Sequence, residues 1–243
     1  MRLTRVFVDA RLGEGNRLTL PTAQSQHLTR VLRVRSGQSV TLFNGDGRDY
    51  ASRIAKVGRG GVVVEIGTPG NEESPAPLRL HIGLGISKGE RMDFALQKAV
   101  ELGVCQITPL FTDRSVVRLE GARLAQRAQH WRGVVIAASE QSGRRRLTDL
   151  ASPARLYDWL ERGHICPLLL DHRGAIPLTG IPAPDRGLTL LVGPEGGLAA
   201  SERVRAQQAG FTAVRLGPRI LRTETAPLAA LAVVQALWGD LGR

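Results

Sequence analysis

The sequence predicts a small all-β barrel followed by a larger α/β domain with a mostly parallel sheet, and three observations lead to this fold class. Short β-type runs separated by glycine-rich turns fill residues 1–66. Residues 68–77, TPGNEESPAP, have the composition of a linker and no hydrophobic period. Beyond them, apolar strand candidates alternate with helical segments, as in parallel α/β domains. We therefore expect a barrel at 1–70 and an α/β domain at 76–243.

Five short runs supply the strands expected in the barrel, and a helix around 27–34 is expected to plug it. This part is strongly basic, with 11 lysines and arginines against 5 acidic residues, so it carries +6 of the total charge of +11. Charge alone leaves two interpretations open, a solvated basic face and an RNA-binding surface. The five runs are 5–8, 18–20, 40–43, 50–57 and 62–66.

Helical periodicity and strand-like runs alternate through the second domain. The first helix follows residues 87–90, SKGE, which we interpret as a capping box, and it ends at Gly103. Further helices are expected at 122–141, after the glycine loop that ends at residue 197, and at 228–238. The last helix is apolar nearly all round and should be buried within its subunit or against a second one. The strand candidates are 78–86, 105–110, 167–171, 188–192 and 213–216.

The net charge of +11 suggests a polyanionic partner, with RNA or DNA ahead of an anionic membrane surface. Of the 33 basic residues 3 are lysine, which leaves 30 arginines. Arginine binds phosphate bidentately and stacks on bases in ways that lysine cannot. A genome that prefers arginine codons would explain this ratio equally well, but it would not explain the net charge.

Several common chemistries find no support in the sequence. It contains no GxxxxGK[ST] phosphate loop, no complete GxGxxG fingerprint and no GxSxG nucleophile motif. The five histidines and the two cysteines, Cys105 and Cys166, show no metal-ligand spacing, so we expect neither a metal nor a disulfide. No apolar segment has the length of a signal-peptide core or a membrane span, and we expect a soluble cytoplasmic protein.

Two loops of unusual composition follow strand candidates in the C-terminal part. Residues 193–197, GPEGG, come directly after the apolar run 188–192, and residues 216–226, LGPRILRTETA, continue from the run 213–216. The carboxyl ends of parallel strands meet at one edge of a sheet, where α/β domains bind small ligands. Glycines let the backbone approach such a ligand closely. The sequence therefore predicts a ligand pocket between the two loops.

At these loops the sequence resembles the SPOUT-class RNA methyltransferases of the RsmE type. The resemblance covers essentially the whole chain and includes KGERM at 88–92, ELGV at 101–104, EQSGR at 140–144 and RVF at 5–7. It implies a PUA-like barrel before a SPOUT domain whose C-terminal chain is threaded into a deep trefoil knot, which periodicity would not show. It also implies a homodimer, S-adenosylmethionine as methyl donor, and methylation of N3 of a uridine in 16S ribosomal RNA of the small subunit.

The resemblance turns the predicted pocket into a methyl-donor site. The reaction requires loss of the N3 proton, and we hypothesise that Glu224 helps to remove or orient this proton while Arg222 stabilises the uridine anion. The alternative is that Glu224 only places negative charge at the N-terminus of the last helix. The expected cofactor contacts are Leu170, Gly193, Pro194, Glu195, Gly196, Gly197, Leu216, Gly217, Ile220, Leu221 and Thr225, and the expected RNA contacts are Arg5, Arg30, Arg33, Arg114 and Arg144.

Some features depart from the family pattern or allow another function. The DHRG run at 171–174 matches no family motif, which leaves its part in binding open. Ala199 stands where a serine would cap the helix after GPEGG, a loss of about 1 kcal/mol that we interpret as local to the helix. The main alternative function is a non-catalytic RNA-binding ribosome-assembly factor of the same fold, against which the intact loops argue. A nucleotide hydrolase would need a lysine, metal ligands or a nucleophile that these loops lack.

Overall fold

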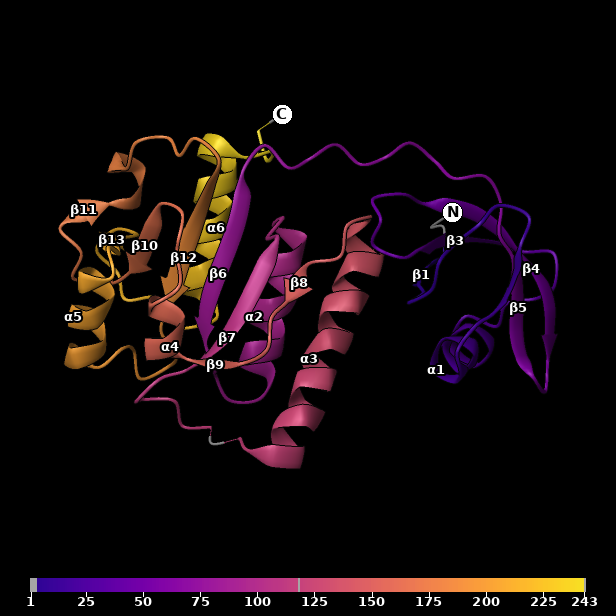
Figure 1. The fold of residues 1–243 in the computed structure, drawn as a ribbon, viewed down its shortest axis with the longest axis horizontal. Coiled ribbons are helices and arrows are strands. Elements are labelled where there is room, and N and C mark those ends of the chain that lie inside the picture. The colour runs from indigo at the N-terminus through magenta and orange to yellow at the C-terminus, as the bar shows by residue number, and fades with distance from the viewer. Residues whose placement is uncertain (1–3, 118, 243) are drawn as a thin grey trace. The chain divides into compact units, whose positions relative to one another are not determined.

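The computed structural model describes residues 4–117 and 119–242, which form two compact units (Figure 1). The first unit contains residues up to Pro75 together with Ser139–Leu147. The second contains Ala76–Ala138 and the chain from Thr148 onward. This division differs from the sequence-based one mainly in the segment Ser139–Leu147, which the sequence placed in the second domain.

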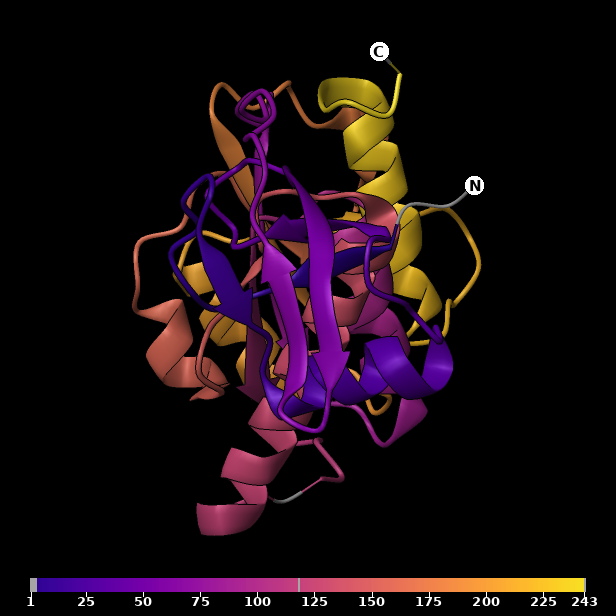
Figure 2. The same ribbon diagram turned by 90° about the vertical axis from the view of Figure 1, so that its right-hand side faces the viewer.

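The first unit is built on a five-stranded mixed sheet with the strand order β1-β3-β4-β5-β2 (Figure 2). Strand β1 pairs parallel with β3, and the other neighbouring strands pair antiparallel. Alternate residues of β4 are buried, as the two-residue period of a half-buried strand requires. All five predicted strands are confirmed, as β1 (Arg5–Phe7), β2 (Arg17–Thr19), β3 (Ser39–Phe43), β4 (Tyr50–Gly58) and β5 (Gly61–Glu65).

A short helical segment packs against this sheet. It begins earlier than predicted, with α1 (Thr22–Gln26), and continues as the π-helical segment η1 (His27–Val31). Leu28 is fully buried in the apolar core of the sheet, which confirms that this helix fills the interior. The chain leaves the segment at Arg33 with a positive φ of 49°, so helical geometry ends before the predicted boundary at residue 34.

Arg5 is a structural residue of the first unit. Its side chain is 12% exposed and pairs with Asp49 at 2.7 Å. It also donates to the carbonyl oxygens of Ser139 and Arg144, at 2.9 and 3.1 Å, and its guanidinium lies 4.4 Å from the centre of the Phe43 ring. A guanidinium held inside the fold in this way is not available to RNA phosphate. The expected RNA contact of Arg5 is therefore corrected, and Arg5 is left out of the proposed RNA-binding set.

The linker is held more firmly than its composition suggests. The Glu73 N–H donates to the Gly47 carbonyl at 2.7 Å. The Glu73 carboxylate in turn accepts the N–H groups of Arg145 and Arg146, both at 2.9 Å. Hydrogen bonds to charged groups contribute about 1.5–3 kcal/mol each, so Glu73 fastens the segment Ser139–Leu147 to the first unit.

The second unit contains an eight-stranded sheet with the order β11-β13-β10-β12-β6-β7-β8, in which β9 also pairs with β7. Neighbouring strands run parallel throughout the described part of this sheet. Strand β12 is buried along its whole length, which explains its mostly apolar sequence. The predicted parallel α/β domain is confirmed, whereas the threading of its C-terminal chain stays a prediction. The strands are β6 (Arg79–Gly85), β7 (Gln106–Phe111), β8 (Asp149–Leu150), β9 (Ala154–Arg155), β10 (Pro167–Leu170), β11 (Ile176–Pro177), β12 (Gly187–Val192) and β13 (Thr212–Arg215).

Helices connect these strands, with α2 packed beside α6 and α4 beside α5. The helix predicted between residue 90 and Gly103 is confirmed as α2, and its apolar residues Met92, Leu96 and Val100 are all buried. Among the residues described, no helix is both long and apolar enough to cross a bilayer. The helices are α2 (Glu90–Glu101), α3 (Gly121–Ser142), α4 (Leu156–Leu160), α5 (Ala200–Gln208) and α6 (Thr225–Trp238), with a 3₁₀ turn η2 (Leu178–Gly180).

The capping box predicted at 87–90 is wrong. Helix α2 begins after Gly89, which has a φ of 59°, and no side chain within the described residues caps it. The Ser87 hydroxyl instead lies 3.3 Å from the Thr223 hydroxyl and 3.4 Å from the Gly85 carbonyl oxygen. The Ser87 hydroxyl thus interacts with a residue distant in sequence and does not cap the helix as the local motif predicted.

A half-buried histidine makes the stability of the second unit dependent on pH. His81 on β6 lies with Nε2 3.0 Å from Thr108 Oγ1, and its ring packs edge-on against Trp159 at 5.6 Å. Burial, aided by the charge of His164, lowers the pKa of His81 from 6.5 to about 4. Because the folded-state pKa lies below the unfolded-state value, this stabilisation is complete above pH 6.5 and is lost progressively as the pH falls toward 4.

We expect the wild-type protein to lose about 2 kcal/mol more unfolding free energy between pH 7 and pH 4 than the variant His81→Gln, after allowing for partial solvent access. The glutamine amide keeps a polar partner for Thr108 but does not titrate. Urea denaturation at the two pH values measures the difference. Equal losses in both proteins would show that another group carries the pH dependence.

Candidate functional site

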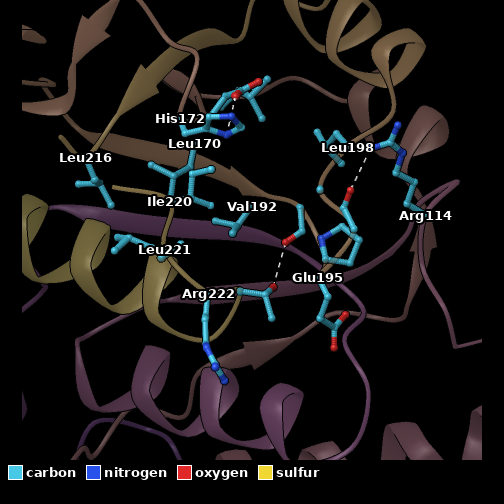
Figure 3. Close-up of a pocket in the computed structure, with 18 of the residues that line it drawn as sticks. Arg114, Leu170, His172, Val192, Glu195, Leu198, Leu216, Ile220, Leu221 and Arg222 are labelled. Atoms are coloured by element: carbon cyan, nitrogen blue, oxygen red, sulfur yellow. Dashed lines mark hydrogen bonds and ion pairs between the residues drawn. The ribbon is translucent and has the colours of Figure 1, made fainter. Parts of the chain in front are cut away.

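A pocket of about 550 Å³ opens at the carboxyl ends of β10, β12 and β13 (Figure 3). Its walls come from the loop 193–197, the segment 216–226 and the residues that follow β10. The two loops are those that the sequence predicts to form a ligand pocket. Their meeting follows from parallel pairing, since β10 lies between β12 and β13 in the sheet.

The glycine loop is rigid before any ligand binds. The Gly197 N–H donates to the Pro194 carbonyl at 2.8 Å, and the Thr223 hydroxyl donates to the Gly193 carbonyl at 3.2 Å. Arg114 Nη1 donates to the Gly196 carbonyl at 3.1 Å (Figure 3). Gly197 has a φ of +64°, a conformation that residues with a Cβ rarely adopt. The loop therefore presents a preformed backbone surface to the pocket.

Apolar side chains line one side of the pocket. Figure 3 shows Leu170, Val192, Leu216, Ile220 and Leu221 around a common space. Ile220 is 77% exposed, so this large apolar side chain is uncovered in the protein alone. A flat apolar ligand group seated here would remove that surface from water, at about 25 cal/mol per Å².

Charged side chains occupy the opposite side. The Glu195 carboxylate accepts the Lys88 N–H at 2.9 Å and contacts Arg91 Nη1 at 3.4 Å. Burial raises the pKa of Glu195, but the hydrogen bonds from Lys88 N–H, its own backbone, Arg91 and Ser87 together bring that pKa below its ordinary value. In Figure 3 the side chains of Glu195 and Arg222 both point away from the apolar wall. Glu195 is thus an ionised anchor that ties the glycine loop to the start of α2.

Glu224 lies where the loop after β13 enters α6. It occupies the residue before the helix but makes no capping hydrogen bond within the described residues. Its Oε2 atom is buried without a hydrogen-bond partner there and lies 4.0 Å from Arg91 Nε. The Arg222 carbonyl accepts the N–H groups of Thr225 and Ala226, which fixes the turn. Glu224 also lines the pocket, so its carboxylate lies both at the start of α6 and in the pocket wall.

A buried carboxylate compensates for the missing serine at Ala199. Glu202 is fully buried and accepts the Ala199 N–H at 2.7 Å and the Asp113 N–H at 2.8 Å. An alanine has no side-chain acceptor, and within the described residues the capping bond at this helix start is the one that the Glu202 carboxylate accepts. The same carboxylate also holds the loop that carries Arg114 beside the glycine loop.

The structure brings most of the predicted site residues together. Both expected catalytic residues, Arg222 and Glu224, line the pocket, as do nine of the eleven expected cofactor contacts. Gly217 and Thr225 do not line it: Gly217 shapes the turn with a φ of +95°, and Thr225 is the exposed first residue of α6. The nine are Leu170, Gly193, Pro194, Glu195, Gly196, Gly197, Leu216, Ile220 and Leu221.

The pattern of the RNA methyltransferase domain family matches residues 74–235, and that of the RNA methyltransferase PUA domain matches residues 20–67. A ribosomal RNA small subunit methyltransferase E from Buchnera aphidicola is 30% identical over 242 residues, which cover 99% of this chain and 98% of that protein. The chain belongs to the methyltransferase E family.

Two solved structures agree with this membership. The enzyme from Neisseria gonorrhoeae, bound to S-adenosylmethionine, is 38% identical with a TM-score of 0.91. A methyltransferase from Legionella pneumophila in complex with the same cofactor is 36% identical with a TM-score of 0.95. Each alignment covers 99% of this chain and 100% of the other.

Several pocket residues of this methyltransferase E chain were not predicted to take part. Arg91, Arg203 and Arg219 line the pocket, and so do Asp171, His172 and Arg173 of the DHRG run, whose part in binding the sequence left open. Asp171 of that run pairs with Arg203 at 3.6 Å, and both residues line the pocket. Arg91 belongs to the KGERM motif, which could have marked it as a site residue. Its contact with the glycine loop could not be predicted, because the two are more than 100 residues apart in the sequence.

The expected RNA-binding arginines divide between the units. Arg30 and Arg33 are exposed on the first unit, at and just after η1. Arg144 is half-buried in the same unit, and its carbonyl oxygen accepts the Arg5 guanidinium. Arg114 lies in the second unit on the pocket wall.

Proposed function

We propose that this chain transfers a methyl group from S-adenosylmethionine to N3 of a uridine in 16S ribosomal RNA of the small subunit. The observation that carries the proposal is the pocket in which the glycine loop and the Glu224 carboxylate meet. Family membership supports the reaction class, and the cofactor-bound relatives support the methyl donor. A ribosomal substrate implies a cytoplasmic enzyme.

The residues of the pocket fit S-adenosylmethionine. Leu170, Leu216, Ile220 and Leu221 form an apolar slot suited to adenine, and the glycine loop allows close backbone approach. Ionised carboxylates on the opposite side favour the positive charge of the cofactor. When bound, S-adenosylmethionine supplies an electrophilic methyl group.

Protein residues then prepare the uridine. Its N3 carries a proton and no free in-plane electron pair, so that proton must leave before N3 can act as a nucleophile. Glu224, whose side chain lines the pocket, accepts the proton. Arg222 is exposed beside it and offsets the negative charge on the pyrimidine ring. The target base must be unstacked to reach this depth.

The direct test is chemical analysis of the RNA. In a strain that lacks the gene, mass spectrometry of 16S ribosomal RNA should show the loss of one N3-methyluridine, restored by the wild-type gene. Purified protein with S-adenosylmethionine and small-subunit RNA or whole subunits should restore the same mass in vitro. Unchanged methylation in the deletion strain would favour the alternative of a non-catalytic assembly factor.

We expect Arg30 and Arg33 to dock RNA through the first unit. Reversal of both charges, Arg30→Glu with Arg33→Glu, should weaken RNA binding on the order of tenfold and reduce the salt dependence of log K by about 1.5, as loss of two phosphate contacts requires. The matched control reverses two other exposed arginines of the same unit, Arg17 and Arg59. If both double variants behave alike, net charge rather than a docking site explains the binding.

A homodimer is proposed from the apolar surface of the second unit. Helix α6 is apolar nearly all round, yet part of its surface is uncovered in the single chain. Leu237 on α6 and Phe94 on the neighbouring α2 are both exposed. Burial of this surface in a second copy would account for its composition. Sedimentation at micromolar concentration should give about 52 kDa, twice the chain mass of 26.2 kDa. A species of 26.2 kDa under these conditions would contradict the dimer.

A further inference from the structure

Arg91 joins the two loops of the pocket through its guanidinium. It lies in the first turn of α2, where Nη1 is 3.4 Å from Glu195 Oε1 and Nε is 4.0 Å from Glu224 Oε2. Glu195 belongs to the glycine loop after β12, and Glu224 to the segment before α6. One cation from a third element therefore touches a carboxylate from each loop.

The two carboxylates depend on this cation. Glu195 Oε2 and Glu224 Oε2 are both buried and have no hydrogen-bond partner in the parts of the chain described. Two buried anions near one another repel, and an uncompensated buried charge is costly. The Arg91 side chain is half exposed, so its positive charge offsets the two carboxylates while its own desolvation costs little free energy.

The structure assigns Arg91 as a positioning residue that holds Glu195 and Glu224 in one geometry and so couples the methyl-donor loop to the proton acceptor. The assignment rests on the proposed function and names a residue for which sequence reasoning gave no role. Arg91 acts through the two carboxylates and does not take the proton itself.

Loss of Arg91 should leave the fold intact. The same three segments are also joined by the Ser87 hydroxyl, 3.3 Å from the Thr223 hydroxyl, which donates to the Gly193 carbonyl at 3.2 Å. The Lys88 N–H remains bonded to Glu195 as well. Removal of the guanidinium should therefore relax the two carboxylates without unfolding the loops.

The test compares Arg91→Met and Arg91→Lys with the control Arg205→Met. Arg205 is a good match because it is 48% exposed against 50% for Arg91 and pairs with Glu161 at 3.3 Å, and neither of these two residues lines the pocket. We expect Arg91→Met to weaken S-adenosylmethionine binding about fivefold by calorimetry and to lower kcat more than tenfold, the scale of lost positioning. Lysine should restore most of both values, and Arg205→Met should match the wild type in both.

A double-mutant cycle with Glu224→Gln separates the effect of Arg91 on Glu224 from its effect on Glu195. If Arg91 acts through Glu224, Arg91→Met should lower kcat less than about threefold in the Glu224→Gln background, while its effect on cofactor binding persists. Wild-type kcat and cofactor affinity in Arg91→Met would overturn the assignment, and so would fully additive losses of kcat. Should Glu224→Gln prove fully active, the proposed base is wrong, yet weakened cofactor binding in Arg91→Met would still support the link to Glu195.

Discussion

Replacement of Glu224 by glutamine is expected to lower kcat by about 10²–10⁴-fold, the contribution of a positioned general base. Glutamine keeps the size of the side chain but cannot accept the N3 proton. The cofactor affinity measured by calorimetry should change less than about threefold, because the effect falls on a step after binding. Single-turnover kinetics with RNA and S-adenosylmethionine over a range of pH would measure the loss.

The matched control for this variant is Glu161→Gln. Glu161 is exposed on the same unit and pairs with Arg205, away from the pocket. It loses the same charge, so any general electrostatic effect on RNA binding should appear in both variants. Wild-type turnover of Glu224→Gln at every pH would remove Glu224 from the mechanism and leave the helix-charging interpretation in its place.

Substitution of Gly85 by alanine is expected to have the largest effect on the cofactor loop. Gly85 ends β6 directly beneath the loop, and a Cβ there would lie 2.5 Å from Pro194 N and 2.9 Å from Gly193 C. Backbone atoms cannot yield to such an overlap without movement of the loop. We expect a loss of about 1–3 kcal/mol in unfolding free energy and at least a tenfold weaker affinity for S-adenosylmethionine.

Gly133→Ala is the control for this steric argument. Gly133 lies in the middle of α3, and a Cβ there would meet nothing within 4 Å. Alanine should stabilise the helix by about 0.5–1 kcal/mol and leave cofactor binding unchanged. Denaturant melts and calorimetry on both variants compare the two sites. Normal cofactor affinity in Gly85→Ala would show that the loop tolerates displacement and that its rigidity is unimportant for binding.

Strand predictions succeeded where a local pattern reports burial directly. Every residue of Gly187–Val192 is buried, and a strand in such a position is mostly apolar. This composition identified the strand in the sequence. In β4 the alternation of buried and exposed residues left the two-residue period that identified it. The pocket was also foreseeable, because parallel strands place the loops that follow them at one edge.

Predictions failed where a distant partner competes with a local motif. Ser87 was expected to cap α2, but it faces Thr223, which lies 136 residues away. Arg5 was expected on the surface, whereas the carbonyl oxygens of Ser139 and Arg144 bind it from segments that only folding brings near. Ala199 lacks a capping hydroxyl, and the buried Glu202 carboxylate supplies the missing acceptor.

The sequence by itself determined the order of most strands and helices, the basic character of the chain and the two loops that form the pocket, because periodicity, composition and turn chemistry are local properties. It did not reveal the short elements β8, β9, β11 and α4. Only the tertiary structure decided which charged groups meet. Arg91 reaches Glu195 and Glu224 because the parallel sheet brings the ends of β6, β12 and β13 to one edge. A charge pair depends on distances in space, and residues more than 100 positions apart carry no local mark of such a contact.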